Sequence, residues 1–107
     1  MKKYYEATEK FHKKNKMKGT NNEDMNFRLN LMTEELGELA QAVTRGYSRE
    51  EIIEENVDLF NLIIGNLISM EISLSEFDAA FWKKHEKIMK REKKLVNGKY
   101  RVSDFRK

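Results

Sequence analysis

The chain of 107 residues has the length of a single domain, and its 21 basic and 18 acidic side chains leave a formal net charge of +3. It contains no cysteine, which excludes disulfides and thiolate metal sites, and no proline. No apolar run approaches the roughly 20 residues that a membrane span needs, and the N-terminus has no apolar signal core. We therefore expect a cytoplasmic protein with no membrane partner.

The charges divide the sequence into three parts. Residues 1–19 carry seven lysines against two acids, residues 20–82 three arginines against thirteen acids, and residues 83–107 eleven bases against three acids. A basic balance raises nucleic acid as a partner, but an acidic centre between basic ends also suits a ligand that combines metal and phosphate. Ordinary solvated helix faces explain most of the lysines.

Periodicity and capping residues predict four helices, over about 2–16, 22–45, 48–72 and 73–94. Gly46 is placed to end the second helix as a C-cap. Ser48 and Ser73 are each followed three residues later by glutamate, the pattern of a capping box that opens a helix. We expect one domain over 1–107, with a core of about 22–94 and an irregular basic arm over about 95–107.

The third predicted helix determines the expected architecture. Apolar side chains cover nearly its whole circumference: Val57, Leu59, Phe60, Leu62, Ile63, Ile64, Leu67, Ile68, Met70 and Ile72. A helix that is apolar all round must be buried on all sides, and three short helices can hardly surround it. We expect an all-α, four-helix bundle-like protomer whose central helices pack against a second copy. A monomer with a partly exposed patch is the alternative.

Acidic side chains occupy one row of the second helix, next to its apolar seam. Leu31, Glu35, Glu38 and Ala42 follow one another at steps of four, three and four, which places them on one side of a helix. The neighbouring seam consists of Leu29, Met32, Leu36, Leu39 and Val43. Glu35 and Glu38 are therefore predicted at or near the buried side of the helix, with Glu34 flanking them.

The third helix carries a matching row with Glu55 and Asp58, and Asp58 is predicted to be buried at the edge of the apolar stretch. If the two helices pack antiparallel, Glu35 and Glu38 face these two acids. Two carboxylates about 6 Å apart at an effective dielectric constant of about 20 repel by roughly 3 kcal/mol. Such an arrangement requires cations or shared protons.

Ligands that offer only oxygen select Mg²⁺, Mn²⁺ or Ca²⁺ over zinc. The chain has no thiols, and its two histidines, His12 and His85, lie outside the acidic rows. The competing interpretation is that each pair of glutamates is a solvated helix edge. A di-iron bundle is disfavoured because neither Glu35 nor Glu55 is followed by histidine at the third position.

The sequence resembles the MazG-like nucleotide pyrophosphohydrolases. Residues 34–42 read EELGELAQA, and residues 55–58 read ENVD after a spacer of sixteen residues, which is similar to the EExxE…ExxD pattern of that family. The resemblance extends over residues 25–92. It implies an all-α dimer or dimer of dimers that hydrolyses a nucleoside triphosphate to monophosphate and pyrophosphate with Mg²⁺, Mn²⁺ being possible.

The resemblance also assigns residues. The metal ligands correspond to Glu35, Glu38, Glu55 and Asp58, and Glu34 matches a further acid of the pattern. A basic pattern on the family's fourth helix that touches phosphate corresponds to Lys84, Lys87 and Arg91, whereas Ile88 stands where the family usually has asparagine. A solvated amphipathic helix is the alternative explanation for these three bases.

The mechanism expected on this basis is attack on the α-phosphorus by a metal-oriented water, with Glu38 or Glu34 as the general base. Aromatic side chains available to stack on the base are Phe27, Tyr47, Phe60, Phe81 and Trp82. Alternatives on the same scaffold are phosphoribosyl-ATP pyrophosphohydrolase or dUTPase activity. The alternative that is not an enzyme is a helical nucleic-acid-binding or regulatory protein. This alternative leaves the buried acids unexplained, so we do not expect nucleic acid as a partner.

Overall fold

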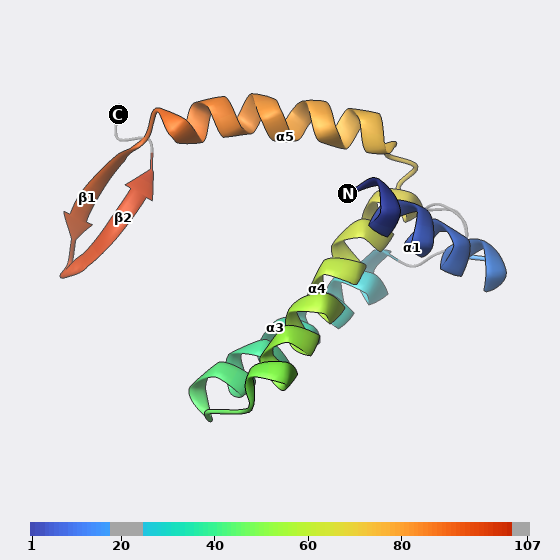
Figure 1. Ribbon diagram of the computed structural model, residues 1–107, viewed down its shortest axis with the longest axis horizontal. Coiled ribbons are helices and arrows are strands. Elements are labelled where there is room, and N and C mark those ends of the chain that lie inside the picture. The colour runs from blue at the N-terminus through green and yellow to red at the C-terminus, as the bar shows by residue number, and fades with distance from the viewer. Residues whose placement is uncertain (18–24, 104–107) are drawn as a thin grey trace. The chain divides into compact units, whose positions relative to one another are not determined.

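The computed structural model describes residues 1–17 and 25–103, which belong to two compact units, Met1–Leu74 and Ser75–Lys107. Helices account for most of the described chain, and a two-stranded hairpin accounts for its strands. In chain order the elements are α1 (Lys2–Lys14), α3 (Met25–Thr44), α4 (Arg49–Ser69), α5 (Leu74–Met89), β1 (Glu92–Val96) and β2 (Lys99–Ser103) (Figure 1). The prediction of an all-α fold with four helices is confirmed.

The connection between α3 and α4 is short and follows the predicted capping chemistry. Gly46 has a φ of +68°, and the backbone N–H of Tyr47 donates to the carbonyl of Ala42 at 2.9 Å, which ends α3 in a Schellman-type turn. Ser48 then caps α4: its Oγ accepts from the N–H of Glu51 at 3.2 Å and donates to the Glu51 carboxylate at 3.1 Å. The predicted start of the second helix near Asn22 lies outside the described residues.

Because this connection is tight, α3 and α4 lie side by side and run in opposite directions, as predicted (Figure 1). Helix α1 packs against α4, where the rings of Tyr4 and Phe60 meet edge to face at 5.7 Å. The Tyr5 hydroxyl donates to the carbonyl of Ile72, which follows the end of α4, at 3.1 Å. Ala42 and Ile64 are fully buried. The three helices thus share one small core.

Much of the apolar surface of α3 and α4 stays outside that core. Several large apolar side chains of the two helices are between 38% and 58% exposed: Leu29, Leu36, Val43, Ile53, Val57 and Ile63. Leu29, Leu36 and Val43, predicted as part of the core seam, therefore face away from the protomer's interior. Their exposure is what the expected packing against a second copy requires, and that assembly stays a prediction.

The second unit differs from its prediction. Helix α5 ends at Met89 instead of near Lys94, and the expected irregular arm is a β-hairpin. Asn97 and Gly98 have φ values of 51° and 75°, the positive values that a two-residue hairpin turn needs at both positions. Val96 and Lys99 pair on either side of this turn. The Asn-Gly pair therefore joins two strands.

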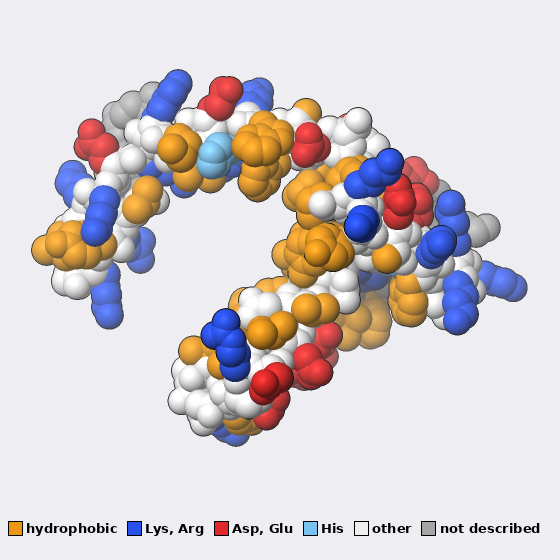
Figure 2. All heavy atoms as spheres, in the orientation of Figure 1, with side chains coloured by type: hydrophobic (Ala, Val, Ile, Leu, Met, Phe, Trp, Pro, Cys, Tyr) orange, Lys and Arg blue, Asp and Glu red, His pale blue; other side chains and the backbone are white. Residues whose placement is uncertain are grey.

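The distribution of surface charge follows the division of charge along the sequence. On the face shown in Figure 2, acidic side chains gather over the α3–α4 pair, and basic side chains cover α1.

Within the described ranges, none of the helices is by itself long and apolar enough to cross a membrane. Helices α4 and α5 taken together as a bent pair meet that test by length and composition.

Candidate metal and substrate site

The two acidic rows meet where α3 and α4 pack. One carboxylate oxygen each of Glu35, Glu55 and Asp58 lie within 4.8 Å of one another. Glu35 comes from the third turn of α3, whereas Glu55 and Asp58 lie three residues apart on α4 and so share a side of that helix. The antiparallel packing thus brings together three of the four residues predicted as metal ligands.

The burial of these acids differs from the prediction. Asp58, expected to be buried, is exposed, while Glu35 and Glu55 are half-buried. The Oε2 atoms of both glutamates are shielded from solvent and have no hydrogen-bond partner. The helical periodicity correctly places Asp58 at the edge of the α3–α4 contact. It does not determine whether the side chain is buried in that contact or exposed to solvent. The unpartnered oxygens are on the two glutamates instead.

The carboxylates perturb one another. Partial burial raises the pKa of Glu35, and the negative charges of Glu38 and Asp58 raise it further. The pKa of Glu55 is likewise raised, first by burial and then by Glu38 and Asp58. Both shifts indicate that this cluster holds more negative charge than its surroundings compensate. A proton or a cation at the cluster would relieve it.

Glu38 and Glu34 stand beside the cluster. Glu38 is exposed on α3 and lies outside the group of three oxygens, but it is close enough for its charge to raise the pKa of both Glu35 and Glu55. Glu34 is an exposed neighbour of Glu35 on the same helix. Both side chains are exposed, so both suit a role in contact with water.

The donor set fits a hard divalent cation. All three converging side chains offer carboxylate oxygen, the ligand that Mg²⁺, Mn²⁺ and Ca²⁺ prefer. Buried oxygens without hydrogen-bond partners are costly, and metal coordination is one way to satisfy them. Three protein ligands leave positions open for water and phosphate oxygens. Glu35, Glu55 and Asp58 would hold the ion.

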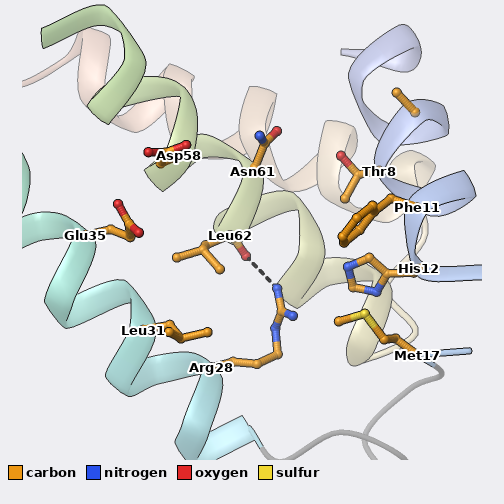
Figure 3. A pocket seen from close by; sticks show the side chains of 11 residues that line it. Thr8, Phe11, His12, Met17, Arg28, Leu31, Glu35, Asp58, Asn61 and Leu62 are labelled. Carbon is orange, nitrogen blue, oxygen red and sulfur yellow. Dashed lines mark hydrogen bonds between the residues drawn. The ribbon is translucent and has the colours of Figure 1, made fainter. Parts of the chain in front are cut away.

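A cavity of about 610 Å³ adjoins the carboxylates. Glu35 and Asp58 line one part of it, and Phe11, Arg28 and Asn61 line the remainder together with other residues of α1, α3 and α4 (Figure 3). Most of its lining is apolar, with a few polar groups, as in sites for small organic ligands. It therefore offers room for the organic part of a ligand next to the acids.

Phe11 and Arg28 were not among the predicted site residues, although both line the cavity. The aromatic side chains predicted to stack on the base do not line it: Phe60 packs on Tyr4, and the rings of Phe81 and Trp82 lie 5.2 Å apart in the second unit. Phe27 is 60% exposed and does not line the cavity. The position of Phe11 depends on how α1 packs on α4, which the periodicity within a single helix does not encode.

The predicted phosphate-binding bases belong to the second unit. Lys84 and Lys87 are exposed on α5, three residues apart. Arg91 lies between the end of α5 and β1, so it does not continue the helical row that its spacing suggested. Their contact with phosphate stays a prediction.

A family model described as phosphoribosyl-ATP pyrophosphohydrolase matches residues 3–85, more than three quarters of the chain. The chain belongs to the phosphoribosyl-ATP pyrophosphohydrolase family. That family is a member of the MazG-like all-α NTP pyrophosphatase superfamily, so the resemblance stated above is confirmed. No curated protein and no solved structure matches the sequence.

Membership defines the protein as a hydrolase that acts on a pyrophosphate bond of a nucleotide-like substrate. The family generally uses divalent metal, which agrees with the cluster of Glu35, Glu55 and Asp58. All the acids discussed above lie inside the matched residues, as does Lys84. Lys87, Arg91 and the hairpin lie outside them.

Proposed function

We propose that this phosphoribosyl-ATP pyrophosphohydrolase family member is a Mg²⁺-dependent nucleoside triphosphate pyrophosphohydrolase that releases pyrophosphate and leaves a monophosphate. The observation that carries the proposal is the convergence of Glu35, Glu55 and Asp58 beside a cavity large enough for a nucleoside. Mn²⁺ is a suitable substitute because it shares the preference for oxygen ligands.

The reaction is the transfer of the nucleotidyl group, which contains the α-phosphorus, to water. The new bond joins the water oxygen to the α-phosphorus, and the bond that breaks links that phosphorus to the oxygen bridging to the β-phosphate. A divalent ion supplies charge neutralisation and a water of lowered pKa when bound. The proton released by the water passes to a carboxylate, either Glu38 or Glu34, both of which are exposed beside the cluster.

Three basic side chains carry charge opposite to that of the leaving pyrophosphate. Lys84, Lys87 and Arg91 are expected to contact the phosphates and to compensate the negative charge on pyrophosphate as it departs. Phe11 and Asn61 line the cavity next to Asp58, so we assign the base and ribose of the substrate to that space. An aromatic face and a side-chain amide are typical contacts for a nucleobase.

Phosphoribosyl-ATP is a second candidate substrate, and the family match favours it. Its triphosphate offers the same α–β bond to the same carboxylates. Its extra phosphoribosyl group distinguishes it from a simple nucleotide, so the two substrates compete for the same acids but differ in what the cavity must accommodate.

We also propose that the protein works as a homodimer or dimer of dimers in the cytoplasm. The exposed apolar side chains of α3 and α4, Leu36 and Val57 among them, support assembly through these helices. The same helices carry the carboxylates, so assembly would shield the site from bulk water on one side.

The test is to incubate the purified protein with dNTPs, NTPs, dUTP and phosphoribosyl-ATP in Mg²⁺ or Mn²⁺ and to quantify pyrophosphate, orthophosphate and monophosphate. We expect metal-dependent release of pyrophosphate that EDTA abolishes and that Glu55→Gln and Asp58→Asn reduce by at least about 100-fold. Release of orthophosphate instead would place the cleaved bond elsewhere. Protein that binds nucleic acid but hydrolyses none of these substrates would support the non-catalytic alternative.

A further inference from the structure

Arg28 is a buried cation that joins α3 to α4. Its side chain is only 6% exposed. Its Nε donates to Oδ1 of Asn66 at 2.8 Å. Its Nη2 donates to the backbone carbonyl of Leu62 at 3.3 Å (Figure 3). Both acceptors belong to α4, so one side chain of α3 is hydrogen-bonded to two residues of the neighbouring helix.

The surroundings of Arg28 are shaped to receive it. A Cβ at Gly65 would overlap with Nη2 of Arg28 and would lie 3.1 Å from Nε2 of His12, so only glycine leaves room for the guanidinium. Asn66 in turn donates through Nδ2 to the sulfur of Met32 at 2.8 Å, which leads back to α3. Three residues of α4 are thus matched to Arg28 and Met32 of α3.

These contacts lie two turns from the carboxylates on both helices. Glu35 follows Arg28 by seven residues on α3, and Asp58 precedes Asn66 by eight on the antiparallel α4. The hydrophobic effect is non-directional, whereas hydrogen bonds to a guanidinium fix the position of their acceptors. A slide of one turn, about 5.4 Å, would exceed the 4.8 Å within which the three carboxylate oxygens meet.

We propose that Arg28, seated over Gly65 and bonded to Asn66 and Leu62, is a positioning residue that sets the register of α3 against α4 and so holds Glu35 opposite Glu55 and Asp58. It acts on the metal site through the helices and does not itself touch the ion. The inference rests on the metal-binding role proposed above. It adds a determinant of the site that lies outside the acidic pattern.

The experiment measures Mn²⁺ binding without nucleotide, from the electron paramagnetic resonance signal of free Mn²⁺. We expect Arg28→Met and Asn66→Leu to bind Mn²⁺ at least about tenfold more weakly than the wild type, the usual effect of removing a group that orients metal ligands. Gly65→Ala should do the same by displacing the guanidinium. Asn66→Asp keeps an acceptor for Arg28 and should restore most of the affinity. Arg45→Met removes an exposed arginine from the end of the same region and should leave binding unchanged.

A second readout reports the register itself. The chain has no cysteine, so cysteines placed at the exposed positions Asn30 and Asn56 can carry nitroxide labels, diluted with unlabelled protein to isolate distances within one chain. Arg28→Met and Gly65→Ala should shift or broaden the distance distribution between α3 and α4, and Arg45→Met should not.

Each outcome decides the inference. Folded Arg28→Met or Asn66→Leu protein with wild-type Mn²⁺ affinity, or with an altered distance distribution and unaltered affinity, would overturn it alone. Wild-type protein that binds no Mn²⁺ would overturn the proposed function and this inference together. If Arg28→Met fails to fold, Asn66→Leu and Asn66→Asp form the deciding pair, because both keep the arginine in place.

Discussion

Glu35 on α3 and Glu55 on α4 each bring a carboxylate oxygen within 4.8 Å of the other, and in both side chains Oε2 is buried without a hydrogen-bond partner. Two half-buried acids at this separation make the cluster unfavourable as long as both are ionised. The free energy of the α3–α4 pair therefore depends on what occupies the space between them.

Stability without metal should fall as the pH rises. The folded state raises the pKa of Glu35 and Glu55 above 4.5, the ordinary value, so it binds more protons than the unfolded chain between the two values. The stabilisation from these groups is complete below pH 4.5 and is lost as the pH rises through the folded-state pKa. Urea unfolding in EDTA over this range measures the decline, and it should be smaller in the Glu35→Gln, Glu55→Gln double variant. An equal decline in that variant would assign the effect to other groups.

The Glu55→Gln variant should separate the effect of this carboxylate on thermal stability from its role in metal binding. Removing one charge from the cluster relieves repulsion, so we expect a higher melting temperature than the wild type in EDTA. Saturating Mn²⁺ should raise the wild-type midpoint, since a ligand at 100 times its dissociation constant contributes about 2.7 kcal/mol, and should leave the variant unchanged. Glu54→Gln, at the exposed neighbouring residue, is the matched control and should keep the Mn²⁺ response. A variant that still gains stability from Mn²⁺ would exclude Glu55 as a ligand.

Replacement of Gly37, within α3, and of Gly46, just after its end, by alanine should change the free energy of unfolding in opposite directions. Gly46 has a φ of +68°, where a side chain is strained, so Gly46→Ala should lower the free energy of unfolding by about 1 kcal/mol. Gly37 lies within α3 with nothing near its missing Cβ, so Gly37→Ala should raise that free energy by about 0.5–1 kcal/mol. Urea titrations of the two variants provide the comparison. A loss at Gly37 would indicate that another molecule covers this side of α3.

Much of the fold followed from local signals. The Ser48 cap and the Gly46 turn fix both ends of the α3–α4 connection, and that short connection makes the helices antiparallel, so that Glu35 and Glu55 lie on facing helices. The hairpin in place of the expected irregular arm is an exception, because its first strand, Glu92–Val96, begins with three charged residues and shows no alternation of polar and apolar side chains. Local chemistry was sufficient for the α3–α4 connection, where a glycine turn and a serine cap lie close together.

The site was only partly predictable for a different reason. Helical steps place Glu35, Glu55 and Asp58 on facing rows, but a row is too broad to say which of two neighbouring carboxylates is covered. The cavity and the Arg28 contact with Asn66 join residues that are far apart in the sequence. Such contacts depend on how whole helices pack, and the period of one helix carries no record of them.

The exposed apolar surface of α3 and α4 should be the site of self-association. Leu36 and Val57 are 56% and 49% exposed in the single chain, so replacing either with glutamate costs the protomer little but places a charge where a second copy would pack. Light scattering after size exclusion should give a multiple of 12.8 kDa for the wild type and the monomer mass for Leu36→Glu and Val57→Glu. Met89→Glu, at a 71% exposed residue of α5, should leave the mass unchanged. A wild-type mass of 12.8 kDa would contradict the proposed assembly.

Phe11 should contribute to substrate affinity and not to metal binding. It lines the cavity next to the carboxylates, where an aromatic ring offers a face to a nucleobase, and such stacking contributes about 1–3 kcal/mol per base. Phe11→Ala is therefore expected to raise KM at least about fivefold, with kcat less affected, since the carboxylates that act on the phosphate are unchanged. Phe27→Ala removes an equally exposed ring outside the cavity and serves as the control. If both variants keep the wild-type KM while Mn²⁺ binding is intact, the base occupies another surface, and the assignment of this cavity to the nucleoside is wrong.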